Sequence, residues 1–157
     1  EDLVVNDIAA HVKRHFHVRD EPWAIGGLSM GGWGALHLGL KHHERFSSIW
    51  AHSSKIFWKE NEADPTMLAE PGDLDLMSRA ERLQATGTSP VVTFDCGVDD
   101  FLIDENRALH AHLDQTGFDH TYREHPGAHT WDYWDDHMRE ALDQHARVLG
   151  IDRIQPE

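Results

Sequence analysis

A single cysteine, Cys96, occurs among the 157 residues of the chain. One thiol excludes an internal disulfide and a zinc site built from four thiolates. We predict that Cys96 is a small, buried apolar residue, because it lies at the end of an expected strand and lacks the flanking glycines of a nucleophilic turn.

Long apolar runs are also lacking. No uninterrupted stretch of roughly 18 apolar residues is present, so the sequence predicts no transmembrane helix. No positively charged start followed by an apolar stretch marks a signal peptide, although such a signal would precede residue 1. We expect a cytoplasmic protein.

Basic side chains are few beside acidic ones: 14 Lys and Arg against 28 Asp and Glu, a formal net charge of −14. A surface of that sign repels phosphate groups, so we expect no nucleic-acid partner and no membrane partner. The hydrophobic share of 39% is enough for a packed core and argues against disorder. The length predicts one domain over residues 1–157.

Helical periodicities and short apolar runs alternate along the chain. Strands are expected at 23–28, 46–52, 90–95 and 120–124, and helices at 2–16, 30–43, 76–86, 103–116 and 131–149. This order predicts an α/β domain in which a mainly parallel sheet lies between two layers of helices, a three-layer αβα arrangement. Residues 53–75 show no clean period, and they form either a lid over the site or a surface loop.

Apolar spacing also predicts which helix faces are buried. In helix 2–16 the face holds Val4, Val5, Ile8, Ala9, Val12 and Phe16. In helix 131–149 it holds Trp134, Met138, Ala141, Leu142, His145 and Leu149. Gly32 and Gly34 would let helix 30–43 approach the sheet closely.

The strongest chemical signal is the segment GLSMG at residues 27–31, which matches G-x-S-x-G between an expected strand and an expected helix. The turn would hold the Ser29 hydroxyl above the sheet in a crowded backbone conformation. Small residues are then needed two positions before and after it, at Gly27 and Gly31. The amide of Met30, at the start of the helix, would donate to an oxyanion.

A serine nucleophile needs a base and an orienting acid, which follow it in the order Ser, acid, His in this fold. Asp99 and Asp100 compete as the acid, and one of them is expected to cap the next helix; we favour Asp100. His125 and His129 compete as the base. His129 is favoured because it follows a Pro-Gly turn on a loop that can reach Ser29, whereas His125 adjoins a strand.

Other residues carry weaker signals. Trp131 could line a substrate pocket, although aromatic residues at the start of a helix more often belong to the core. The 14 histidines include the close pairs His11/His15, His110/His112 and His125/His129. Zinc sites need three or four convergent ligands, and no H-E-x-x-H motif occurs. We therefore expect solvent-facing or core-edge histidines and no metal.

The segments GLSMGGWGAL, CGVDDFLIDENRALHAHL and GFDHTYREHPGAHTWDYWDDH resemble the esterase D group of α/β-hydrolases. That group includes S-formylglutathione hydrolases, small-ester esterases, and feruloyl and acetylxylan esterases. The resemblance implies an α/β-hydrolase fold and a carboxylesterase activity without metal or organic cofactor. It also implies a catalytic triad of Ser29, Asp100 and His129.

One departure from the group is clear. Its members begin with several strands and an oxyanion loop before the helix that lies here at residues 2–16. We therefore expect this chain to be the C-terminal portion of the fold, with the second oxyanion donor in an absent N-terminal part. The alternative is a homo-oligomer in which a second copy pairs with the bare sheet edge.

The functional hypothesis is a serine carboxylesterase that hydrolyses small acyl esters or acylated sugars through an acyl-enzyme. One alternative is an acyltransferase that uses the same triad. The other is a binding module that keeps the scaffold without the chemistry, although a broken triad would be its expected signature.

Overall fold

The computed structural model describes residues 1–20, 22–56 and 75–151. In this part of the chain, a sheet of parallel strands has the order β1-β2-β3-β4, so each strand pairs with the next one along the sequence. The strands are β1 (Trp23–Leu28), β2 (Phe46–His52), β3 (Val91–Gly97) and β4 (Thr121–His125). Parallel neighbours need a crossover, and every crossover here contains a helix.

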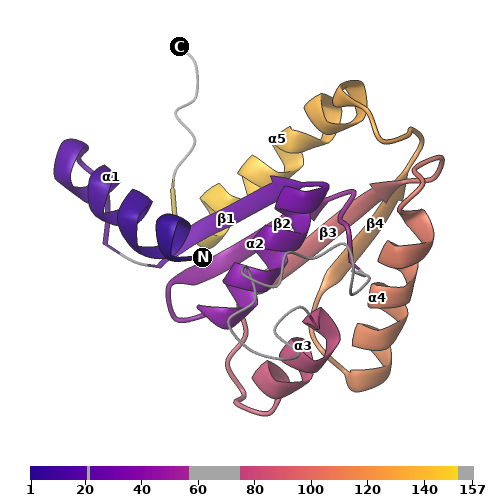
Figure 1. Ribbon diagram of the computed structural model, residues 1–157, viewed down its shortest axis with the longest axis horizontal. Helices are drawn as coiled ribbons and strands as arrows, with labels where there is room; N and C mark the ends of the chain where they lie inside the picture. Colours follow the sequence, from indigo (N-terminus) through magenta and orange to yellow (C-terminus); the bar gives the residue numbers. More distant parts are fainter. Residues whose placement is uncertain (21, 57–74, 152–157) are drawn as a thin grey trace.

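Helices cover both faces of the sheet (Figure 1). One face carries α2 (Met30–Lys41), α3 (Leu76–Gln84) and α4 (Ile103–Thr116), and the other carries α5 (Trp131–Val148). The expected three-layer α/β architecture with a parallel sheet is therefore confirmed, and the predicted strands and helices differ from the observed ones by only one or two residues at their ends.

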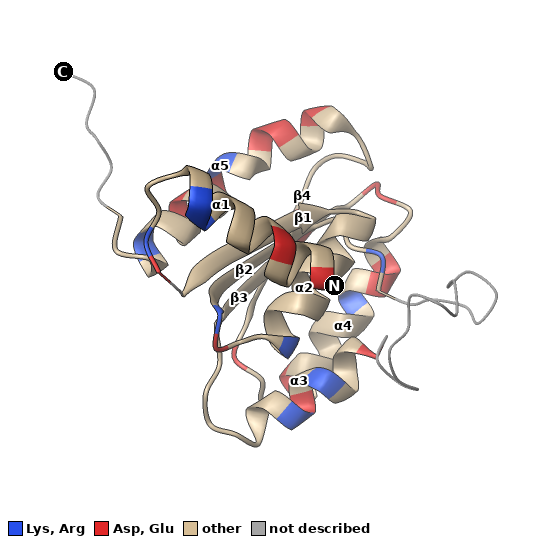
Figure 2. Ribbon diagram, turned by 60° about the vertical axis from the view of Figure 1, so that its left-hand side comes forward, with Lys and Arg blue, Asp and Glu red and all other residues tan. Residues whose placement is uncertain are grey.

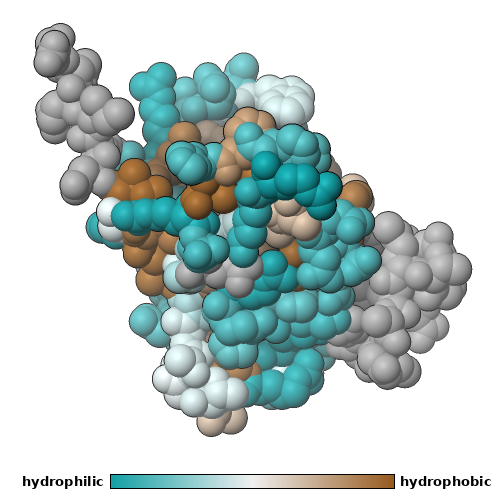
Figure 3. Space-filling view, turned by 90° about the vertical axis from the view of Figure 1, so that its left-hand side faces the viewer, coloured by the Kyte–Doolittle hydropathy of each residue, from teal (hydrophilic) through white to brown (hydrophobic). Residues whose placement is uncertain are grey.

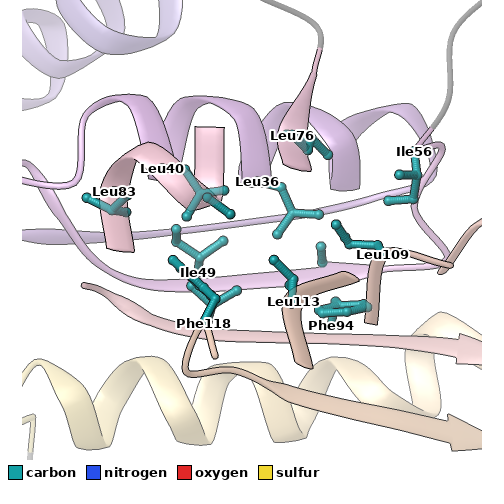
Figure 4. Packing of buried hydrophobic residues seen from close by; sticks show 13 residues of the cluster. Leu36, Leu40, Ile49, Ile56, Leu76, Leu83, Phe94, Leu109, Leu113 and Phe118 are labelled. Atoms are coloured by element: carbon teal, nitrogen blue, oxygen red, sulfur yellow. The ribbon is translucent and has the colours of Figure 1, made fainter. Parts of the chain in front are cut away.

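The main hydrophobic core lies between the sheet and the layer of α2, α3 and α4 (Figure 4). Leu36 and Leu40 from α2 meet Ile49 and Phe94 from the strands. Further members come from α3, α4 and the segment after α4, including Ala80, Leu83, Leu109, Leu113 and Phe118. These side chains bury most of the apolar surface that the three helices carry, which fixes the helices over the sheet.

The opposite face of the sheet is more polar, and this changes which residues of α5 are buried. Gln144 donates to the carbonyl oxygen of Ile49 at 3.1 Å, and His145 lies 2.8 Å from the hydroxyl of Ser48. The buried stripe of α5 consists of Tyr133, Trp134, Ala141 and Gln144. The expectation that Met138 and Leu142 are buried is wrong, because polar strand residues select polar partners on α5.

The N-terminal segment is helical as predicted, but its first part is a π-helix, η1 (Leu3–Ile8), which continues as α1 (Ala9–His15). It runs along the β1 side of the sheet. Glu1 at its start contacts Lys41 at the end of α2, and Arg19 beyond its end donates to the carbonyl oxygen of Leu149 after α5.

The predicted apolar face of this segment is only partly buried. Val5 and Ala9 are buried, whereas Val4, Ile8 and Phe16 are exposed. Figure 3 shows apolar surface on this side of the molecule. Among the described residues β1 pairs only with β2, so its other edge has no strand partner. Within this described part of the chain, no further strand is therefore present at that edge to cover the exposed apolar side chains of η1 and α1. That an N-terminal part of the fold supplies further strands stays a prediction.

Acidic residues are spread over the helices around the sheet and do not form one block (Figure 2). Within the described residues, no helix combines the length and the apolarity that crossing a membrane requires. The cytoplasmic location stays a prediction.

Of the excursion at 53–75, only residues 53–56 and Asp75 are described, and Asp75 caps α3. Ile56 belongs to the hydrophobic core, and the amide of Lys55 donates to the carbonyl oxygen of Ser29 at 3.2 Å. Backbone and side-chain bonds hold the start of the excursion against α4: Glu105 accepts from the amide of Ile56 at 2.8 Å, and Asn106 donates to the carbonyl oxygen of Ser54 at 2.9 Å. Residues 57–74, on which the lid hypothesis mainly depends, lie outside the described residues.

The two leucines Leu109 and Leu142 test this distribution of burial. Leu109 is 2% exposed in the core, whereas Leu142 is 58% exposed on α5. We expect Leu109→Ala to lower the free energy of unfolding by about 2–5 kcal/mol, since it leaves a cavity. The matched change Leu142→Ala should alter it by less than about 0.5 kcal/mol. Urea unfolding followed by circular dichroism measures both, and equal losses would contradict the burial described here.

Candidate active site at the carboxyl ends of the strands

Ser29 occupies a strained turn between β1 and α2. Its backbone has φ 56° and ψ −119°, a conformation that non-glycine residues rarely adopt. A Cβ at Gly27 would overlap the carbonyl group of Gly31, so the turn can form only if position 27 has no side chain. The predicted need for a small residue at Gly31 is wrong in one respect: open space surrounds a Cβ there, and its backbone is what crowds Gly27.

The helix that follows Ser29 also lies close to the strand ends. A Cβ at Gly32 would overlap the hydroxyl of Ser54, as expected for a glycine that allows close approach. A Cβ at Gly34 would meet nothing within 4 Å, so that part of the prediction is wrong. Gly39 takes the role instead, since a Cβ there would overlap the side chain of Ile49. A glycine is needed only on the side of α2 that faces the sheet, where Gly32 and Gly39 lie and Gly34 does not.

Backbone hydrogen bonds join the end of each strand to the loop that follows its neighbour. The amide of Ser29 donates to the carbonyl oxygen of His52 at 2.9 Å, and the amide of Ser53 donates to that of Asp95 at 2.7 Å. The amide of Val98 donates to the carbonyl oxygen of His125 at 2.9 Å. The loops after β1, β2 and β3 are therefore held at one edge of the sheet, and the amide of Asp99 joins the loop after β4 to them through the carbonyl oxygen of Gly127.

This arrangement brings three predicted side chains together. His129 Nε2 lies 3.0 Å from Ser29 Oγ, and His129 Nδ1 lies 2.9 Å from Asp100 Oδ2. Asp100 is buried, and its Oδ1 also accepts from the amide of Leu102 at 2.9 Å. The imidazole thus bridges the hydroxyl and a carboxylate whose orientation the backbone fixes.

The competing residues lie elsewhere. Asp99 is exposed, and its amide donates to the carbonyl oxygen of Gly127 at 2.9 Å. His125 ends β4, and its ring stacks on His137 with centroids 4.0 Å apart. Burial and the neighbouring His137 lower the pKa of His125. We expected one aspartate to orient the base and the other to cap the helix. Asp100 orients the base, but neither aspartate is the N-cap of α4, which is Leu102.

A second polar cluster lies beneath the site, and it was not predicted from the sequence. Its centre is Asp95, which is fully buried at the end of β3. Asp95 accepts hydrogen bonds from Trp50 Nε1 at 2.6 Å and from the Tyr133 hydroxyl at 2.7 Å, and His52 Nδ1 lies 2.8 Å away. Burial alone would raise the pKa of Asp95, but His52, Tyr133 and Trp50 lower it overall.

This cluster anchors the start of α5 behind His129. Tyr133 is tied to Asp95, and the neighbouring Trp134 donates to the hydroxyl of Ser53 at 3.2 Å. The indole of Trp134 packs edge-to-face on the imidazole of His129, with centroids 4.9 Å apart. Buried groups of β2 and β3 therefore position the loop that carries His129.

Three exposed apolar side chains lie on the segments that carry Ser29, Asp100 and His129. Met30 follows Ser29 directly, and its amide is the first N–H of α2, a group without a carbonyl partner inside the helix. Phe101 is 76% exposed, with its ring centroid 4.6 Å from that of His129. Trp131 is 74% exposed and lies edge-to-face on Trp134. Phe101 was not singled out from the sequence, although it directly follows the predicted acid.

Cys96 lies close to this site but has no role as a nucleophile. It is fully buried, and burial together with the charge of Asp100 raises the pKa of its thiol to about 12. A thiol with such a pKa stays protonated near neutral pH. The prediction of a small, buried residue at this position is confirmed.

The parallel sheet, the turn at Ser29 and the Ser29–His129–Asp100 contacts define the class of protein as an α/β-hydrolase. A family model described as "Putative esterase" matches residues 1–145. The chain belongs to this esterase family, which confirms the resemblance seen in the sequence.

Individual relatives agree with this assignment. An acetyl esterase of Caldicellulosiruptor saccharolyticus is 31% identical over 169 residues, covering 94% of this chain and 64% of that protein. A ferulic acid esterase structure is 25% identical with a TM-score of 0.80, over 95% of this chain and 61% of its own. An S-formylglutathione hydrolase structure from Agrobacterium tumefaciens is 25% identical with a TM-score of 0.78, over 95% of this chain and 57% of its own. The chain thus spans about three fifths of the length of these relatives.

Gly27 and Gly34 offer a matched test of the strained turn. We expect Gly27→Ala to lower the free energy of unfolding by about 1–3 kcal/mol, because the new methyl group meets backbone that cannot move aside. Gly34→Ala should be neutral or stabilise by up to about 1 kcal/mol, since the space is open and alanine favours a helix. Thermal and urea unfolding measure both, and a well-tolerated Gly27→Ala would contradict the described turn.

Proposed function

We propose that the protein containing this chain is a serine carboxylesterase acting on small acyl esters or acylated sugars. The observation that carries the proposal is the double contact of His129, 3.0 Å from Ser29 Oγ and 2.9 Å from Asp100 Oδ2. A neutral imidazole in this position can take a proton from the hydroxyl while the carboxylate holds its other nitrogen. The esterase family of the chain supports the same reaction.

In the proposed reaction, Ser29 Oγ attacks the ester carbonyl carbon as its proton passes to His129 Nε2. Asp100 accepts the Nδ1–H and stabilises the imidazolium that forms. The carbonyl oxygen becomes an oxyanion, and the amide of Met30 is proposed as one of its donors. Loss of one such donor costs roughly a hundred- to thousandfold in rate in related sites.

Collapse of the tetrahedral intermediate breaks the bond to the leaving alcohol, which receives the proton from His129. The acyl group then remains on Ser29. Water attacks this acyl-enzyme while His129 takes its proton, and the second collapse releases the acid and restores the hydroxyl. Overall, one ester and one water give one acid and one alcohol.

The apolar border of the site supports a role in substrate binding. Met30 follows Ser29, Phe101 contacts His129, and Trp131 contacts Trp134, so each exposes apolar surface on a segment of the site that can contact an acyl chain or the face of a sugar ring. We propose Trp131 and Phe101 as substrate contacts on this basis. Related proteins named for acetyl, ferulic acid and S-formylglutathione substrates fit a conserved reaction with a variable substrate.

Replacing Ser29 tests the proposal directly. In the complete protein that contains this chain, we expect Ser29→Ala to lower the turnover of p-nitrophenyl acetate by at least about a thousandfold, because alanine has no hydroxyl to form the acyl-enzyme. The same variant should lose labelling by a fluorophosphonate probe, while its circular dichroism spectrum stays that of the parent. Turnover close to that of the parent would remove Ser29 from the reaction.

The adjacent aspartates Asp99 and Asp100 form a matched pair for the role of the acid. We expect Asp100→Asn to reduce kcat on the order of 10⁴-fold, because an amide cannot favour the required imidazole tautomer. Asp99→Asn, at an exposed position, should leave kcat within about twofold. Ester hydrolysis by both variants is measured under the same conditions. A larger loss from Asp99→Asn would reverse the assignment.

A further inference from the structure

Two groups of three side chains outside the catalytic contacts bring their donor atoms within 4.8 Å of one another in the described part of the chain. One consists of His110, Asp114 and His120, and the other of His125, His137 and Glu140. The pairing His110/His112 that stands out in the sequence does not converge: His112 lies 2.9 Å from Glu81 on α3 instead. A set of two imidazoles and one carboxylate is a ligand set for a divalent transition metal.

The second group is already occupied by protein contacts. His137 Nδ1 lies 3.1 Å from Glu140 Oε1, and the guanidinium of Arg123 contacts Glu140 Oε2. Both carboxylate oxygens therefore have cationic or N–H partners, and the charge of Arg123 opposes the entry of another cation. In the first group, the basic side chains within 4 Å of the Asp114 carboxylate among the described residues are His110 and His120, with no Lys or Arg.

In the first group, hydrogen bonds determine which ring nitrogens of His110 and His120 carry a proton and which carry a free electron pair. His120 Nδ1 lies 2.8 Å from the carbonyl oxygen of Phe118, which can only accept, so Nδ1 carries the proton. Its Nε2 then has a free electron pair, which accepts from His110 Nδ1 at 2.8 Å. A backbone carbonyl that fixes the tautomer of a histidine in this way is typical of metal ligands.

The same tautomers leave an unfavourable contact that a cation would relieve. With Nδ1 of His110 donating, its Nε2 has an electron pair that lies 3.6 Å from Asp114 Oδ2. Asp114 Oδ1 lies 3.8 Å from His120 Nε2. Ligands of a tetrahedral zinc ion are roughly 3.3 Å apart, given bonds of about 2.0–2.1 Å. The two distances from Asp114 are thus within about 0.5 Å of that value, and all three donor atoms lie within 4.8 Å of one another.

We propose that His110, Asp114 and His120 bind one divalent transition-metal ion of the Zn²⁺ or Co²⁺ type. His120 is preformed for this role, since its side chain is 3% exposed and stacks on Phe94. Asp114 is 62% exposed, so an ion can enter from solvent and water can complete its coordination. Binding replaces the hydrogen bond between the imidazoles, and the half-exposed ring of His110 turns its electron pair to the ion.

The ion would fasten the last turns of α4 to the start of β4. His110 and Asp114 lie one turn apart on α4, and His120 directly precedes β4. This is the end of the sheet opposite to Ser29 and His129, so the ion has a stabilising role and takes no part in ester hydrolysis. Nitrogen ligands favour Zn²⁺ or Co²⁺ over Mg²⁺ and Ca²⁺, which prefer oxygen.

Titration of the full chain, prepared without a polyhistidine tag, with CoCl₂ tests the site. We expect one equivalent to bind with the visible absorption of four- or five-coordinate Co²⁺, and ZnCl₂ to displace it. Asp114→Asn and His120→Gln should each lower the affinity for Co²⁺ at least about tenfold. His137→Gln, in the other group, should leave the affinity within about twofold.

Thermal unfolding gives a second readout. ZnCl₂ should raise the apparent melting temperature of the parent chain and not that of Asp114→Asn, because an ion that binds only the folded state stabilises it. Asp114 is exposed, so this variant decides the matter even if His120→Gln fails to fold. The proposal is overturned if no saturable binding occurs, if Asp114→Asn binds Co²⁺ like the parent, or if His137→Gln is the variant that loses binding. Esterase activity is not an input to any of these measurements.

Discussion

The site depends on backbone hydrogen bonds that join the loop after each parallel strand to the end of the neighbouring strand. In each case, the first residue of a loop after one strand donates its amide to the end of the next strand, as Ser29 does to His52 and Val98 to His125. Parallel pairing makes this repetition natural, since all carboxyl ends meet at one edge. Three loops that lie far apart in the sequence are therefore fixed by backbone groups, before any side chain of the site makes a contact.

Packing beneath the loops adds what the backbone does not supply. The ring of His129 must face both Ser29 and Asp100, and Trp134 supports it from one side. The start of α5 is in turn held by the buried carboxylate of Asp95 through Tyr133. A buried charge of this kind is costly unless it is paired, and here three donors or cationic partners surround it. The cost is offset by a fixed position for the helix that carries the aromatic support.

Local periodicity predicted the strands and the helix order, and a steric motif predicted the turn at Ser29. Asp100 and His129 were predicted from their order along the chain and their position after the strands. The sequence was less informative where the burial or the role of a residue depends on contacts with residues that are distant along the chain. Leu142 fits the apolar spacing of α5 but is exposed, since Ser48 and Thr93 present a polar surface to that helix. Asp95 gave no signal because its partners are distant in the sequence, and His120 gave none because only the loop after α4 brings it to His110.

α4 and β4 lie side by side, and a group of side chains at each end of this pair depends on their alignment. The loop before α4 holds Asp100, and the loop after β4 holds His129, so any shift between them opens the contact at 2.9 Å. At the other end, the His110–Asp114–His120 group spans the same two elements. Asp114 lies 11 residues after Ile103, the first residue of α4, which is roughly 16 Å along the helix and beyond the range of about 8–10 Å over which salt leaves charges unscreened. An ion at that end would thus act on the catalytic contacts through the alignment of α4 and β4 rather than through its charge.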